Sequence, residues 1–275
     1  MQDKQQGSRS KRFKEAVKAE IREHKSSYWV FMVLRTLILV AIVRHIMLGD
    51  YQSVFTCCTA MVLLLAPSIF QVTFQVEIPK GLEITILCFV YAAVILGEIN
   101  AFYIAIPFWD TMLHTLNGFL CAAVGLSLVG LLNDNQKIAF HLSPFYLAVT
   151  AFCFSMTVGV LWEFCECFAD LYLGTDAQKD WIVSSFQTVK LDETNTNIAV
   201  PVEGVKDVIL VYADGSKQAL GLGGYLDIGL LDTMKDLGVN FIGAVVFSVF
   251  GYLQAKSKER GGWTALFVPH RKKVS

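Results

Sequence analysis

The chain has 275 residues, of which 54% are apolar and only 17% are charged, and its formal net charge is −1. Its mean hydropathy is +0.50. Soluble globular domains carry about a quarter charged residues, so this composition indicates a membrane protein with several spans. The sequence has no long basic stretch interleaved with aromatic residues, which argues against a nucleic-acid partner.

Residues 1–27 form a polar and basic segment ahead of the first apolar run. Phe13, Val17 and Ile21 recur every four residues within it, which predicts an apolar stripe on a basic helix. Such a helix is typical of segments that lie on an anionic membrane surface. We therefore expect a cytoplasmic amphipathic segment that contacts the lipid bilayer.

Six apolar runs approach or exceed the length of about 20 residues that crosses a hydrocarbon core. The first run is too long for a signal peptide, and no small-residue cleavage pattern follows it. The predicted fold is all-α, with five transmembrane helices in residues 28–173, a sixth in 231–255 and a basic tail in 256–275. The six runs are residues 28–48, 53–70, 82–106, 110–132, 143–173 and 231–254.

The long polar segment 174–230, between the last two spans, is rich in Asp, Glu, Thr and Gly. Residues 208–212 and 217–220 flank the turn sequence Ala213-Asp214-Gly215-Ser216, a pattern that predicts a strand, a turn and a strand. Residues 181–189 are a further candidate strand. We expect a small β-rich insertion that is also a possible docking site for a protein partner.

Lys and Arg set the expected orientation, because they concentrate on the cytoplasmic side of membrane proteins. The basic residues gather at the two ends of the chain, and six spans place both ends on one side. We therefore expect a multi-pass protein of a bacterial inner (plasma) membrane with both termini in the cytoplasm. The insertion 174–230 then faces the extracytoplasmic side.

Several apolar runs contain polar residues at a similar predicted depth in the membrane. Charges placed at random would not share one depth. Each set falls in the predicted outer half of its helix, within roughly 15 Å of the boundary at 1.5 Å per residue. Spacings of three or four residues put the members of each set on one helix face. The sets are Asp110 and His114, Glu163 and Glu166 with Asp170, Asp232 and Asp236, and Glu98 on its own.

Carboxylates gathered in a membrane repel each other, and a bound cation would offset that repulsion. Asp, Glu and His are ordinary ligands of divalent metals, and pairs on facing helices are how helical bundles build such sites. The expected metal is Mn, Fe, Mg or Zn, and the catalytic candidates are Glu163, Glu166 and His114. The expected metal ligands are Asp110, His114, Glu163, Glu166, Asp232 and Asp236.

Structural roles compete with these assignments. Asp110 and Asp232 lie near the membrane interface, where they could simply cap helices. Asn117 and Asn240 could form interhelical hydrogen bonds. Gly118, Gly125, Gly238 and Gly243 are expected to serve close helix packing.

Three classes of function are compatible with an acidic site near the outer leaflet. One is a metal-dependent enzyme that acts on a lipid-linked or small extracytoplasmic substrate, with a carboxylate as general base. Another is a transporter whose acids bind a cation or relay protons, although the inner halves of the spans offer few polar residues. The third is a non-catalytic scaffold that binds a partner through the insertion.

The ordered polar motifs resemble those of a bacterial family of inner-membrane proteins, the YjdF-like family. The first is Trp109-Asp110-x3-His114 followed by Gly118, and the second is Trp162-Glu163-x2-Glu166. The third is Asp232-x3-Asp236-x3-Asn240-x2-Gly243-Ala244. The resemblance implies a polytopic helical membrane protein in which these polar positions are shared, and it implies no activity. The long insertion and the basic N-terminal extension depart from the family pattern.

Overall fold

The computed structural model describes residues 14–19, 25–74, 76–133, 142–257 and 270–271. In this part of the chain six helices are long and apolar enough to cross a membrane, as the sequence predicts. The structure has two compact units, residues 1–159 with 239–275 and residues 160–238. The six candidate spans are Ser27–Leu48, Tyr51–Phe74, Lys80–Ile99, Trp109–Gly130, Pro144–Leu173 and Leu230–Ser257.

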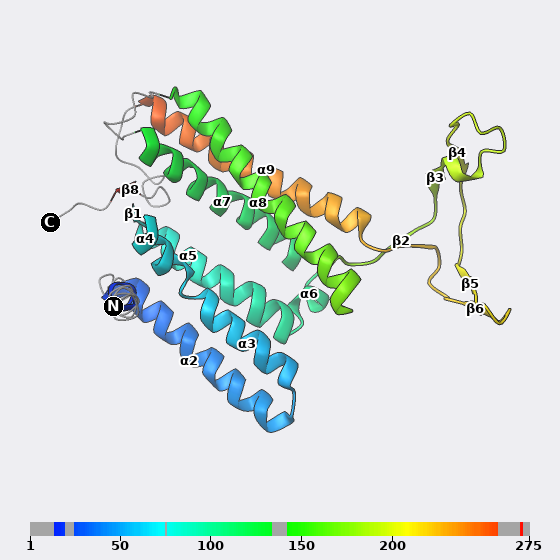
Figure 1. The fold of residues 1–275 in the computed structure, drawn as a ribbon, viewed down its shortest axis with the longest axis horizontal. Helices are drawn as coiled ribbons and strands as arrows, with labels where there is room; N and C mark the ends of the chain where they lie inside the picture. The colour runs from blue at the N-terminus through cyan, green and yellow to red at the C-terminus, as the bar shows by residue number, and fades with distance from the viewer. Residues whose placement is uncertain (1–13, 20–24, 75, 134–141, 258–269, 272–275) are drawn as a thin grey trace, which may run out of the picture. The chain divides into compact units, whose positions relative to one another are not determined.

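The first three spans pack together within the first unit (Figure 1). They are built from α2 (Lys25–Leu48), α3 (Tyr51–Leu63), α4 (Ala66–Phe74), α5 (Lys80–Val90) and the π-helical segment η1 (Tyr91–Ile99). Their shared core includes Ile38 of α2, Cys57 of α3 and Leu87 of α5. Gly49 forms the turn between α2 and α3 with a positive φ of 72°, and the carboxylate of Asp50 then caps α3 by accepting from the Ser53 N–H.

The third span ends at Ile99, so the predicted extent of residues 82–106 is too long. Ala101 adopts a left-handed conformation, with φ of 56°, and this turns the chain out of the helix. Only a short helix, α6 (Phe102–Ala105), follows before Pro107, which disfavours helical geometry at the residue before it. The apolar composition of residues 100–106 concealed this break from a prediction based on hydropathy.

The remaining helices of the first unit are α7 (Trp109–Asn133) and the adjoining parts of α8 (Pro144–Leu173) and α9 (Leu230–Ser257). Within this unit they lie side by side (Figure 1). The ring of Phe119 on α7 meets that of Phe247 on α9 edge to face, with centroids 4.8 Å apart. Phe152 of α8 packs on Phe241 of α9 in the same way at 5.3 Å. Alanines line the core between them, so the helices approach closely.

Two very short strands of the first unit pair with each other. Strand β1 (Val76–Glu77) pairs antiparallel with β8 (His270–Arg271) of the C-terminal tail. Neither strand has a sequence pattern long enough to predict it. The N-terminal stripe stays a prediction, because Phe13 and Ile21 lie outside the described residues, although Val17 is buried in the helix over residues 14–19.

The insertion in the second unit is β-rich, as predicted, and consists of three strand pairs. The predicted hairpin is confirmed as β5 (Ile209–Val211) and β6 (Lys217–Ala219). Residues 181–189 form two strands rather than one, β2 (Trp181–Val183) and β3 (Phe186–Thr188), which pair with different partners. These partners are β7 (Tyr225–Asp227) for β2 and β4 (Val200–Val202) for β3.

Candidate functional site

Asp110 and His114 form a pair on the first turns of α7, as their four-residue spacing predicts. The Nε2 atom of His114 lies 3.4 Å from Oδ1 of Asp110. The His114 side chain is only 12% exposed and that of Asp110 only 22%, so most of each lies inside the protein. An imidazole held beside a carboxylate is oriented for a defined role, either as a proton carrier or as a metal ligand.

One turn deeper, α7 is hydrogen-bonded to α9 through two asparagines. The Nδ2 atom of Asn117 donates to Oδ1 of Asn240 over 3.3 Å, and the Asn240 side chain is almost completely buried. The thiol of Cys121 donates to Oδ1 of Asn117 at 3.4 Å. The expected interhelical hydrogen bond is therefore confirmed, and it fixes the register between α7 and α9.

Glycines bring the backbones of α7 and α9 into direct contact and let α8 approach the Asn240 side chain. A Cβ atom at Gly118 would overlap the Asn240 carbonyl, and one at Gly243 would overlap the Thr115 carbonyl. On α8, a Cβ at Gly159 would lie 2.7 Å from Nδ2 of Asn240. Ser155 of α8 adds a hydrogen bond of 2.7 Å to the carbonyl of Gly118.

Two other glycines were also expected to serve close packing. The expectation holds for Gly125, where a Cβ would lie 2.8 Å from the side chain of Phe154. It is wrong for Gly238, where a Cβ would meet nothing within 4 Å. Close packing is therefore concentrated on one side of α9, where Asn240 and Gly243 lie.

In the second unit, Glu163 and Glu166 occupy the later turns of α8. Glu163 is 4% exposed, whereas Glu166 is partly exposed and accepts a 2.8 Å hydrogen bond from Nε1 of Trp162. The predicted three-residue spacing therefore produces two acids in different environments. The Trp162 indole therefore orients the Glu166 carboxylate, a contact that the spacing of the two acids does not predict.

Asp170, near the end of α8, holds the loop that follows it. Its carboxylate accepts hydrogen bonds from the Thr175 hydroxyl and from the backbone N–H groups of Ala177 and Gln178, at 2.8, 2.6 and 2.8 Å respectively. This carboxylate therefore has a structural role in shaping the entrance to the insertion.

Asp232 and Asp236, on the first turns of α9, share the ammonium group of Lys235. Its Nζ atom lies 3.1 Å from Oδ1 of Asp232 and 3.3 Å from Oδ1 of Asp236. Asp232 also accepts from the backbone N–H of Lys179 at 2.9 Å and from Nε1 of Trp181 at 3.4 Å. Both oxygens of Asp232 are thus engaged in binding the insertion to α9, while Asp236 is 2% exposed.

Two further acids, Glu98 and Asp227, lie in other surroundings. Glu98 on η1 is exposed, unlike the other acids placed at this depth. Asp227, just ahead of α9, accepts from the Leu231 N–H at 2.9 Å and so binds an otherwise unpaired donor at the helix start. His, Asp and Glu side chains, which are ordinary ligands of divalent metals, thus lie on α7, α8 and α9.

The fold and the polar residues define the class as a polytopic helical membrane protein with acids in its spans. A family model described as "Predicted membrane protein (DUF2238)" matches residues 28–257. The chain belongs to this family, and the resemblance to YjdF-like proteins is consistent with it. No curated protein and no solved structure matches the chain.

Proposed function

We propose that the protein binds a divalent metal ion near the insertion side of α7, α8 and α9 and uses it to activate water. The proposed ligands come from Asp110, His114, Glu163 and Asp236, and Glu166 is the proposed general base. Asp232 is left out of this set, because its two oxygens already accept hydrogen bonds from the insertion and from Lys235.

Helix geometry around Asn240 is the observation that carries the proposal. Asn240 contacts both Gly118 and Gly159, so α7, α8 and α9 share one depth there. On α7, His114 lies four residues before Gly118. On α9, Asp236 lies four residues before Asn240, and on α8, Glu163 lies four residues after Gly159. Because α8 runs opposite to the other two helices, each of these steps moves about 6 Å toward the same end of the bundle.

The donor set suits a metal that accepts both oxygen and nitrogen. We propose that His114 of α7 supplies the nitrogen ligand, and that Glu163 of α8 and Asp236 of α9 supply oxygen ligands. Carboxylates with one imidazole match Mn, Fe, Mg or Zn. A single ion held by His114 would take its oxygen ligands from Asp110, Glu163 and Asp236.

Charge balance supports a bound cation. Asp110, Glu163, Glu166 and Asp236 lie on candidate spans, where an ionised carboxylate is costly unless a positive charge compensates it. Lys235 pairs with Asp236 and is shared with Asp232. A divalent ion would add positive charge beside the remaining carboxylates.

The two glutamates suit different tasks in such a site. Glu163 is buried, which favours a role as ligand, and Glu166 is partly exposed and oriented by Trp162, which favours a role as general base. A bound metal would supply the chemistry of activating a water molecule, and Glu166 would be placed to accept a proton from that water. Hydrolysis of a substrate at the extracytoplasmic surface is the reaction class that this arrangement supports.

Elemental analysis of detergent-purified protein, reconstituted with Mn, Fe, Mg or Zn, tests the proposal. We expect stoichiometric metal in the wild type and a loss of affinity of about 10- to 100-fold or more in His114→Gln, Glu163→Gln and Asp236→Asn. Glu98→Gln, which alters an exposed acid on another span, is the matched control and should retain the metal. A metal-free wild type, or equal metal in all variants, would overturn the proposal.

Two other functions predict different results in the same preparation. A transporter would show cation flux when reconstituted in liposomes, and Glu163→Gln would abolish it. A scaffold would bind a partner through residues 174–230 and would show neither metal nor flux. Stoichiometric metal without flux is the result that favours the enzyme.

A further inference from the structure

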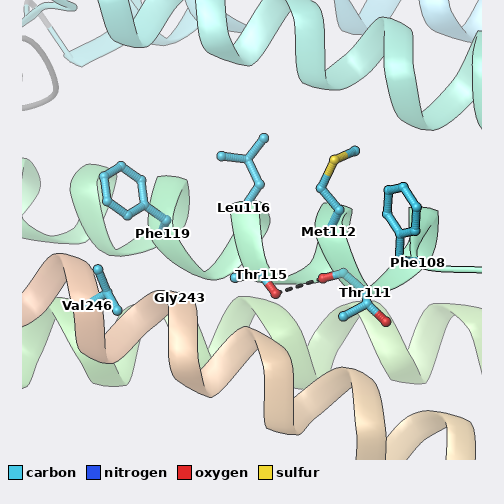
Figure 2. Close-up of a pocket in the computed structure, with 8 residues that line it drawn as sticks. All are labelled: Phe108, Thr111, Met112, Thr115, Leu116, Phe119, Gly243 and Val246. Carbon is cyan, nitrogen blue, oxygen red and sulfur yellow. Dashed lines mark hydrogen bonds between the residues drawn. The ribbon is translucent and has the colours of Figure 1, made fainter.

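An apolar groove of about 450 Å³ lies between α7 and α9 within the first unit (Figure 2). Pockets of roughly 300–1,000 Å³ are typical of ligand sites. One wall consists of Phe108, directly before α7, and of five α7 residues, Thr111, Met112, Thr115, Leu116 and Phe119. Gly243 and Val246 form the α9 wall.

The lining of the groove is matched to hydrocarbon. The hydroxyl of Thr115 donates to the carbonyl of Thr111 at 2.7 Å, so this polar group is satisfied within α7 (Figure 2). Gly243 contributes no side chain, and its backbone packs directly on the Thr115 carbonyl, so only backbone lines this part of the groove. Both walls belong to candidate membrane spans, whose surroundings in a bilayer are hydrocarbon, so an apolar occupant suits the groove.

The length of the groove corresponds to one leaflet. Phe108 and Phe119 are eleven residues apart, which is about 16 Å along a helix. Half of a hydrocarbon core of about 30 Å is close to this value. One lipid tail lying along α7 would therefore fill the groove from the interface to the bilayer centre.

The end of the groove at Phe108 adjoins the polar pair. Thr111 and Thr115, which line the groove, directly follow Asp110 and His114 in the sequence, and consecutive helix positions differ by about 100° around the axis. The polar pair and the groove therefore occupy neighbouring faces of α7 at the same depth. A tail in the groove would leave its head group beside Asp110 and His114.

We propose that this groove binds the tail of a phosphorylated membrane lipid, and that such a lipid is the substrate class of the site. The second half of this proposal, that the lipid is the substrate, rests on the proposed metal ion. Bound among the carboxylates, that ion would attract the phosphate of the head group. The tail part rests only on the groove and can be tested separately.

The test uses a single-chain phospholipid with a photoactivatable group in its tail, added to the full-length protein in nanodiscs. Peptide mapping should place the cross-links on Met112, Leu116 and Val246. Val246→Trp fills the groove and should lower the cross-link yield about tenfold, which corresponds to losing contacts worth about two buried methylenes. Val249→Trp is the matched control, because Val249 is an exposed valine of α9 that does not line the groove.

Metal content measured on the same samples separates the two proposals. Val246→Trp should bind metal like the wild type, and His114→Gln should lose metal while the tail still cross-links in the groove. Equal cross-linking in the wild type, Val246→Trp and Val249→Trp would overturn the groove proposal and leave the metal proposal intact. A groove covered by a second copy of the chain would exclude the lipid and leave Met112, Leu116 and Val246 unlabelled, and this would also overturn the proposal.

Discussion

Gly243 illustrates how single residues determine the packing of α7 against α9. A methyl group there would overlap the Thr115 carbonyl, so Gly243→Ala must push the helices apart. We expect a loss of about 1–3 kcal/mol in stability, measured by thermal unfolding in detergent. Gly130→Ala is the control on α7, because a Cβ at this position meets nothing within 4 Å, and alanine should be neutral or slightly stabilising there. Equal effects of the two substitutions would refute this description of the contact.

Asp232 should behave differently from the proposed metal ligands, because its carboxylate holds the insertion on α9. Asp232→Asn weakens the charge-assisted hydrogen bonds from Lys179 and Trp181 and the ion pair with Lys235. We expect limited proteolysis to cut residues 174–230 faster, while the metal content stays unchanged. Loss of metal with unaltered proteolysis would instead assign Asp232 to the metal site.

Some of these residue roles were predictable from the sequence, and others were not. The Asp110–His114 pair and the hydrogen bond between Asn117 and Asn240 follow from helical spacing within charge-poor spans. The partners of Asp232 do not, because Lys179 and Trp181 lie about fifty residues away and only the folded insertion brings them close. Glu98 is a different case. Its position along the third span matches the depth of the other acids, but its side chain is exposed, which position along a helix does not reveal.

At the scale of elements, the loop after η2 (Val189–Leu191) is organised by one carboxylate. Asp192 accepts from the Thr194 side chain and from the backbone N–H groups of Ile198, Thr194 and Thr196, and these bonds lower its pKa from 3.8 to about 2. The stabilisation is therefore complete above the ordinary value and disappears as the pH falls through about 2.

A carbon-13 NMR titration of aspartate-labelled protein checks this value. The Asp192 carboxyl should titrate with a midpoint near pH 2. Thr194→Val removes the side-chain donor, the largest cause of the shift, and should move the midpoint upward toward 3.8. A midpoint near 3.8 in the wild type would show that these hydrogen bonds do not persist in solution.

Hydropathy predicted the existence of the helices better than their ends. All six spans are present, yet the third ends at Ile99, because Ala101 and Pro107 interrupt a run that stays apolar. The hairpin of β5 and β6 was predictable from its turn residues. The pairing of β2 with β7 was not, because more than forty residues separate the two strands.

At the scale of the whole molecule, the six spans and the basic ends lead us to propose cytoplasmic termini and an extracytoplasmic insertion. We expect a cysteine placed at Ser216, in the exposed turn between β5 and β6, to react with a membrane-impermeant maleimide in intact cells. A cysteine at Ser275 should react only after the membrane is permeabilised. The reverse pattern would invert the topology and place the acidic residues at the cytoplasmic side.

We propose that α7, α8 and α9 contribute ligands to a single metal ion, and pulsed electron paramagnetic resonance tests this proposal most directly. Mn²⁺ accepts both carboxylate and imidazole ligands, so the loaded protein should show coupling to one histidine nitrogen. His114→Gln should abolish that coupling, and Glu163→Gln and Asp236→Asn should each weaken Mn²⁺ binding. Failure to bind Mn²⁺ stoichiometrically, or a signal without nitrogen coupling that is identical in all three variants, would contradict the claim.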